Sequence, residues 1–263
     1  MRQAALEKIG LKGFGAMAMA ALLALATDTW AQTCPLKPWM TFRGTPLWRS
    51  ADGKAYAYKT DHIEIDADGA PRAYCPGDTG LDLLRNAGFP GSNWADVLIP
   101  DPLDPSRPYV QTEGPGKGCY LSGTSLRSKT NTDPTSYADA TVVPYMVFPG
   151  SFLRLSGTGY VGDFAAMRSA DGKHRPAAIV GDTGGGPKAP LGEISIALAK
   201  ALGGRSPSPR NGVADLHGPI TVVVFRGSHE VPVWPVDLAR IESRSAEGLA
   251  ALGGWEAIEQ CPL

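Results

Sequence analysis

Alternating hydrophobic and polar residues predict several short strands along this chain. Tyr56 and Tyr58 alternate with alanine in 54–59, and isoleucine alternates with polar residues in 62–66, as in strands with one buried face. Continuous apolar runs at 177–180 and 219–225 indicate strands that are buried on both faces. Further strands are expected at 118–125, 140–148 and 164–167.

Helical spacing is less frequent. Thr79 is placed to cap a short helix that ends at Gly88, a second helix is expected at 195–202, and a third at 236–252. Irregular loops are expected at 100–108, where there are four prolines, at 181–188, where there are three successive glycines, and at 205–211. The pattern therefore predicts one β-rich domain with a few peripheral helices.

Composition agrees with this picture. The 263 residues include 32 glycines and 23 prolines, which favour tight turns and short strands over a helical bundle. Hydrophobic residues make up 43% of the chain and charged residues 19%, so a packed core is expected.

The N-terminus has the features of a secretory signal peptide. Three basic residues precede an uncharged stretch at 14–26, and Thr29-Trp30-Ala31 has the small-x-small pattern of a cleavage site. A membrane anchor is the alternative, but the apolar run is shorter than the roughly 20 residues that span a bilayer. We therefore expect a signal peptide at 1–31, a mature domain at 32–263, and a secreted or periplasmic location.

The four cysteines (Cys34, Cys75, Cys119 and Cys261) all follow the predicted cleavage site. An even number of cysteines in an exported chain indicates disulfides, and four cysteines allow three pairings. We favour Cys34–Cys261 and Cys75–Cys119. The four histidines form no H-x-x-x-H or H-E-x-x-H pair, so neither a metal nor a cofactor is expected.

The net charge of the chain argues against nucleic acid and anionic membranes as binding partners. The formal net charge is −1 at pH 7, which gives no reason to expect binding to nucleic acid or to an anionic membrane surface. Acidic residues are concentrated, however, between Asp61 and Asp82, where Arg72 is the basic residue that opposes them. This concentration is either a solvated surface rich in turns or a binding surface for cations.

Candidate chemistry is found near the glycine-rich loop. A buried strand leads to Asp182 in that loop, and Glu193 follows eleven residues later, just before a helix. Two carboxylates beside an open loop suit glycoside hydrolysis, in which one acts as acid and the other activates water. Alternatively, Glu193 serves only the helix dipole and Asp182 is an ordinary turn residue.

Five short sequence motifs occur here in the same order as in one known family, and the resemblance rests on them. They are Ile65–Pro71, Thr79–Asp82, Val143–Tyr145, Gly162–Ala165 and Leu191–Ala199. They are similar to the fungal-type chitosanases of glycoside hydrolase family 75, which also has bacterial members. The resemblance runs from about residue 56 to 203. It implies an inverting endo-hydrolase of β-1,4-linked glucosamine polymers, whose essential aspartate and glutamate match Asp182 and Glu193.

From this resemblance we expect Glu193 to act as general acid and Asp182 as the base that positions water. Asp66 and Asp68 are the candidates for binding protonated amines of the substrate. Tyr56 is the candidate for stacking on a sugar, and the alternative is that it packs in the core. The sequence departs from the family pattern at Ile194, where glycine is usual, and in the loop 183–186. These departures leave both carboxylates in place and put the shape of the cleft in doubt.

The segment around Asp182 also resembles double-psi β-barrels such as those of expansins and lytic transglycosylases, which implies a six-stranded barrel core. Two alternatives to a chitosanase follow. One is a hydrolase of peptidoglycan or partly acetylated chitin with the same carboxylates, and the other is a non-catalytic, expansin-like glycan-binding barrel. In each case we expect a monomer whose partner is a polysaccharide.

Overall fold

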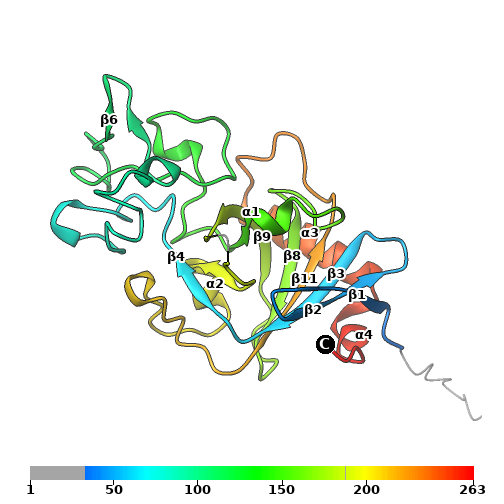
Figure 1. Ribbon diagram of the computed structural model, residues 1–263. Coiled ribbons are helices and arrows are strands. Elements are labelled where there is room, and N and C mark those ends of the chain that lie inside the picture. Colours follow the sequence, from blue (N-terminus) through cyan, green and yellow to red (C-terminus); the bar gives the residue numbers. More distant parts are fainter. Residues whose placement is uncertain (1–32, 187) are drawn as a thin grey trace, which may run out of the picture. The chain divides into compact units, whose positions relative to one another are not determined.

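The computed structural model describes residues 33–186 and 188–263, and these residues are mainly β with a few helices (Figure 1). The strands are β1 (Leu36–Phe42), β2 (Thr45–Ser50), β3 (Ala55–Thr60), β4 (Glu64–Asp66), β5 (Pro100–Asp101), β6 (Asp104–Pro108), β7 (Tyr145–Pro149), β8 (Phe164–Arg168), β9 (Ala177–Gly184), β10 (Glu193–Ser195) and β11 (Ile220–Phe225). The helices are α1 (Gly150–Leu153), α2 (Ile196–Ala201), α3 (Leu238–Ala251) and α4 (Gly254–Ile258). Short 3₁₀ helices are η1 (Pro76–Asp78), η2 (Trp94–Asp96), η3 (Pro134–Ser136) and η4 (Pro209–Asn211). The mainly β, single-domain prediction is confirmed, whereas the predicted signal peptide at 1–31 lies outside the described residues.

Nine strands form one mixed sheet in the order β1-β2-β3-β11-β8-β9-β7-β10-β4. Most neighbours are antiparallel, but β7 pairs with β9 in parallel and β10 pairs with β4 in parallel. Strand β11 lies between β3 and β8, and all six of its residues are buried. The continuous valines therefore mark a central strand, as the sequence predicted.

The two longer helices also confirm their predictions. In α2, the Ser195 side chain accepts a hydrogen bond from the Leu198 N–H, which is an N-cap. In α3, Asp237 caps the first turn in the same way, and the helix packs against β8, β9 and β11. No helix among residues 33–186 and 188–263 is both long and apolar enough to cross a membrane.

The predicted disulfide pairing is confirmed. Cys34 is bonded to Cys261 near the C-terminus, and Cys75 is bonded to Cys119. The first bond joins the segment that leads into β1 to the end of the chain, and the second closes a loop within the irregular segment between β4 and β7.

That irregular segment differs from three predictions. Residues 118–125, predicted as a strand, form only isolated bridges at Tyr120 and Ser122. Residues 79–88 form turns instead of a helix, because the backbone N–H groups of Leu81 and Asp82 donate to the carbonyls of Arg72 and Ala73. Residues 100–108, predicted as a loop, form the small β5–β6 hairpin. In the latter two places backbone hydrogen bonds to a nearby stretch of the chain outweigh the local propensity.

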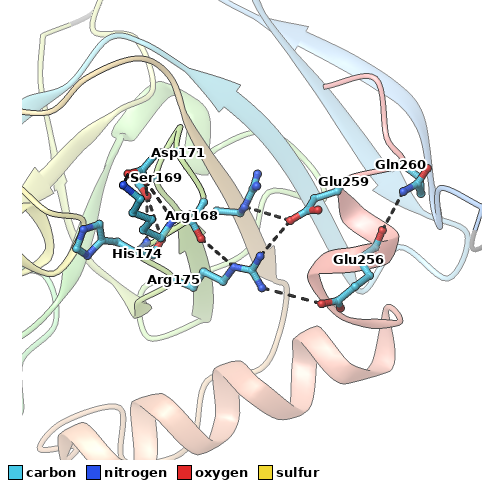
Figure 2. A network of polar contacts seen from close by, with 10 residues as sticks. Arg168, Ser169, Asp171, His174, Arg175, Glu256, Glu259 and Gln260 are labelled. Carbon is cyan, nitrogen blue, oxygen red and sulfur yellow. Dashed lines mark hydrogen bonds and ion pairs between the residues drawn. The ribbon is translucent and has the colours of Figure 1, made fainter.

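Charged side chains connect α4 to the sheet (Figure 2). Arg168 at the end of β8 and Arg175 just before β9 both form ion pairs with Glu259, at 3.2 and 3.3 Å. Arg175 also lies 4.0 Å from Glu256. These side chains are 24–71% exposed, and ion pairs near a surface stabilise a fold only weakly. The ion pairs therefore orient the C-terminal segment but add little to the free energy of unfolding.

Candidate active site

A cleft of about 1290 Å³ lies over the ends of β4, β9 and β10. Its walls come from the segment that follows β4, from residues 123–130, from the start of α1 and from η4. Seven carboxylates line it: Glu64, Asp66, Asp68, Asp82, Asp96, Asp182 and Glu193. Four of the five residues predicted from the sequence therefore lie in one cleft.

Asp182 lies in a strand, which corrects the prediction that it lies in a loop. Strand β9 continues to Gly184 because it stays paired with β7, where Val147 lies opposite Asp182 and Phe148 lies opposite Thr183. The register shifts between Met146 and Val147. Gly181 permits this irregularity, since a Cβ at this position would lie 2.4 Å from Cβ of Tyr145.

The side chain of Asp182 is held by three hydrogen bonds. Its Oδ1 accepts from the Ser125 N–H at 2.9 Å, from the Ser125 hydroxyl at 2.7 Å and from the Thr183 N–H at 2.6 Å. Burial raises the pKa of Asp182 to about 7, the charge of Asp66 adds to this rise, and the hydrogen bonds oppose it. Asp182 is thus a fixed carboxylate that changes charge near neutral pH.

Glu193 lies level with Asp182. In β10 it pairs in parallel with Glu64 of β4, and on its other side it pairs with Val147 of β7. Val147 is therefore the partner of both Asp182 and Glu193, which stand on the two strands that flank β7. Because neighbouring strands lie about 4.8 Å apart, the two backbones are roughly 10 Å apart at this level.

The surroundings of Glu193 differ from those of Asp182. Its carboxylate accepts no hydrogen bond from the part of the chain that the structure describes, and its Oε2 lies 3.5 Å from where a Cβ on Gly184 would be. Burial, followed by the charges of Asp66 and Glu64, raises the pKa of Glu193 well above its usual range. The glycine run thus leaves open space beside a carboxyl group that favours its protonated form.

Asp66 and Asp68 lie beside this pair. Asp66 accepts hydrogen bonds from the Tyr145 hydroxyl at 2.8 Å and from the Asp68 N–H at 2.9 Å, and burial raises its pKa to about 6. One buried carboxylate oxygen of Asp68 has no hydrogen-bond partner among the described residues. Burial and the charges of Asp66 and Asp182 raise the pKa of Asp68 well above its usual range.

Carboxylate oxygens of Asp66, Asp68 and Asp182 lie within 4.8 Å of one another. Like charges at this spacing repel strongly in a buried place, so the cluster favours shared protons or a bound cation. A protonated amine or a metal ion would each satisfy it electrostatically. The sequence contained the residues of this cluster but no spacing that predicted a metal.

Tyr56 does not belong to the cleft, which corrects its assignment to sugar stacking. Its side chain is 0% exposed in β3, its hydroxyl donates to the Thr158 carbonyl at 2.9 Å, and its ring lies against Tyr58 and Phe152. A ring enclosed by the core cannot contact a polysaccharide. Strand β3 is buried on both faces, which corrects the prediction that the alternation at 54–59 marks a strand with one buried face.

Sequence reasoning did not find the residues that support the carboxylates. Ser125 holds Asp182, and Tyr145 holds Asp66, across separations of 57 and 79 residues. Tyr145 belongs to one of the motifs that resemble the chitosanases, and this membership could have marked it as a residue of the site. Nothing local to Ser125 distinguishes it from other serines in turns.

A comparison of the chain with models of known protein families finds no match, and no curated protein matches it either.

Proposed function

We propose that this chain is a secreted, inverting endo-glycoside hydrolase that cleaves β-1,4-glucosamine linkages of chitosan. The main support is the register of β7, in which Val147 brings Asp182 and Glu193 level on either side of one strand in an acidic cleft. Inverting hydrolases need about 6.5–9.5 Å between their carboxyl groups, and backbones roughly 10 Å apart are compatible with that separation. The resemblance to glycoside hydrolase family 75 supports the same residues.

In the proposed reaction Asp182 removes a proton from a water molecule, whose oxygen bonds to the anomeric carbon. Glu193 donates its proton to the glycosidic oxygen as the bond from that oxygen to the anomeric carbon breaks. The products are two shorter chains with one water added, and proton exchange with solvent restores both carboxyl groups. The hydrogen bonds to Asp182 favour its ionised form, whereas Glu193 has no such bonds within the described residues, so the two environments agree with these roles.

Binding of the substrate amines is assigned to Asp66 and Asp68. An ammonium group that enters the cluster with Asp182 would offset the repulsion among three carboxylates and would satisfy the unpartnered oxygen of Asp68. The same contact would lower the pKa of each carboxyl group, because a nearby positive charge favours the ionised form.

The proposed fold of the site is a six-stranded barrel of the double-psi type. Strands β3 and β4 are separated by residues 61–63, yet β3 pairs with β11 while β4 pairs with β10. If β3 and β4 are treated as one bent strand, the series β11, β8, β9, β7 and β10 leads from one half of it to the other. Such a closed series would place the cleft at one end of the barrel.

Chitosan is expected to yield new reducing ends, and fully acetylated chitin and peptidoglycan are expected to yield few. A reducing-end assay on polymers of graded acetylation would measure this preference. If acetylated or muramyl polymers are cleaved faster than chitosan, chitosan is not the preferred substrate. Binding to chitosan without new reducing ends would contradict the proposed hydrolase and favour a wall-binding module.

The pH profile tests the assigned roles. Activity on a soluble oligosaccharide is expected to rise with pH as Asp182 ionises near its pKa of about 7, and to fall at higher pH as Glu193 loses its proton. Replacing Asp66 by Asn removes a negative charge that raises the pKa of Asp182. The acid limb of kcat/KM should therefore move to lower pH, by about one unit.

The matched control for this shift is Asp96→Asn, since Asp96 lines the cleft but is absent from the groups that shift the pKa of Asp182. Its acid limb should coincide with that of the wild type. An acid limb that stays in place in Asp66→Asn, or moves to higher pH, would contradict the coupling between Asp66 and Asp182.

A further inference from the structure

Two arginines, Arg127 and Arg154, line the acidic cleft on opposite sides of the end of β9. On one side the Leu126 N–H donates to the Gly181 carbonyl at 2.7 Å, which places residue 127 next to β9. On the other side Pro149 of β7 lies opposite Gly184, and α1 follows directly, with Arg154 as its C-cap. The two arginines therefore flank the strand that positions Asp182.

Neither arginine is used for an ion pair within the described residues. Arg127 donates to the Thr124 carbonyl at 3.0 Å, a contact that leaves most of its N–H groups free, and the guanidinium of Arg154 has no partner there. Both side chains are exposed. Seven carboxylates line the same cleft, yet none of them forms an ion pair with Arg127 or Arg154 within the described residues.

Arg210 is the third arginine of the cleft and has a different role. It donates to the backbone carbonyls of Asp78 and Gly80 and so joins η4 to the segment that follows β4. Its positive charge also lowers the pKa of Asp82, against the larger rise that burial causes. Arg210 is therefore committed to the protein, whereas Arg127 and Arg154 are available to a ligand.

We infer that Arg127 and Arg154 form a carboxylate-binding rim, and that the preferred substrate is a glycan with both amine and carboxylate groups. This inference rests on the proposed function and adds the substrate class to it. In a cleft that otherwise carries seven carboxylates, the two guanidinium groups would repel the amines that lie nearest to them in a uniformly cationic polymer. Arginine instead matches the planar, two-oxygen geometry of a carboxylate and binds it with charge-assisted hydrogen bonds.

The test compares binding of chitosan oligosaccharides with O-carboxymethylated chitosan oligosaccharides of the same length, which keep their amines. Titration calorimetry on the full chain with Glu193→Gln measures Kd without turnover. The carboxymethylated ligand is expected to bind about tenfold more tightly, as one charge-assisted hydrogen bond is worth roughly that factor.

Adding Arg127→Gln and Arg154→Gln is expected to reverse this preference. Loss of the guanidinium groups should weaken binding of the carboxymethylated ligand and strengthen binding of unmodified chitosan, because repulsion of its amines is removed. Arg85→Gln with Lys117→Gln is the matched control, since these exposed residues lie outside the cleft and remove the same charge. The control should keep the wild-type preference.

Equal Kd values for the two ligands in the wild-type rim, or a preference that persists without both arginines, would overturn the carboxylate-binding rim. The proposed function is judged separately, by new reducing ends from wild-type enzyme. If the chain prefers the carboxymethylated ligand but cleaves neither polymer, the carboxylate-binding rim is supported and the proposed hydrolase activity is contradicted. If the chain cleaves both polymers and binds them without preference, the hydrolase activity is supported and the carboxylate-binding rim is contradicted.

Discussion

Replacing Asp182 by Asn, or Glu193 by Gln, is expected to lower kcat on chitosan by about 10²–10⁴-fold, the usual contribution of a general acid or base. Both substitutions keep the shape of the side chain and remove its ability to exchange a proton. The amide introduced by Asp182→Asn can still accept a hydrogen bond from Ser125 through its oxygen, so the fold around β9 should persist. Initial rates from a reducing-end assay would measure the loss.

The two variants should differ when the leaving group is changed. An aryl glycoside with an acidic phenol needs no proton at the departing oxygen, so Glu193→Gln should regain much of its rate on that substrate. Asp182→Asn should not, because water still needs a base. Proton NMR of the first product should show the α-anomer, as expected for inversion.

Asp96→Asn is the control for these variants, since Asp96 lines the cleft at an exposed position in η2 and should change the rate only slightly. Wild-type rates in either Asp182→Asn or Glu193→Gln would contradict the assignment. If the activated leaving group restores the rate of Asp182→Asn, then Asp182 is the general acid and Glu193 is the base.

Asp163→Ala is expected to cause the largest loss of stability, about 3–5 kcal/mol of the free energy of unfolding. The Asp163 side chain is 0% exposed, and it accepts hydrogen bonds from the N–H groups of Tyr160, Gly227 and His229. It also contacts Nδ1 of His229 at 2.8 Å. Alanine would remove a fully buried carboxylate and leave these four partly buried groups without their shared partner.

These bonds connect two neighbouring strands at one end. Tyr160 belongs to the turn before β8, and Gly227 and His229 follow β11, so Asp163 joins the start of one central strand to the end of the next. Urea denaturation followed by tryptophan fluorescence would measure the change. Asp163→Asn keeps one oxygen acceptor and should lose less stability than Asp163→Ala.

The control is Asp171→Ala, which removes a carboxylate that accepts hydrogen bonds from Ser169 and Lys173 in an exposed turn. Water can replace those bonds, so the loss should stay near 1 kcal/mol or less, roughly the size expected for an exposed site. Equal effects at Asp163 and Asp171 would show that burial of Asp163 does not contribute as argued.

Secondary structure was predictable where the hydrophobic pattern is local and strong. The continuous valines of β11, the alternation in β3 and the capped helix after Ser195 are properties of a few adjacent residues, and each was found. The hairpin β1–β2 was missed, because its partly exposed strands alternate weakly. The segment 79–88 was predicted wrongly, because its backbone groups bond to Arg72 and Ala73.

The sequence by itself determined the mainly β class, the presence of disulfides and the candidates Asp182 and Glu193, because turn residues, cysteine count and motif order are local properties of the chain. Which of the three possible cysteine pairings forms was decided by the tertiary structure. Only the tertiary structure decided that Val147 sets the two carboxylates level, that Ser125 and Tyr145 support the acidic cluster, and that Tyr56 lies in the core. Strand register and burial depend on contacts between residues far apart in sequence. Such contacts leave no periodic signal in either partner, and they decide which carboxylates share one cleft.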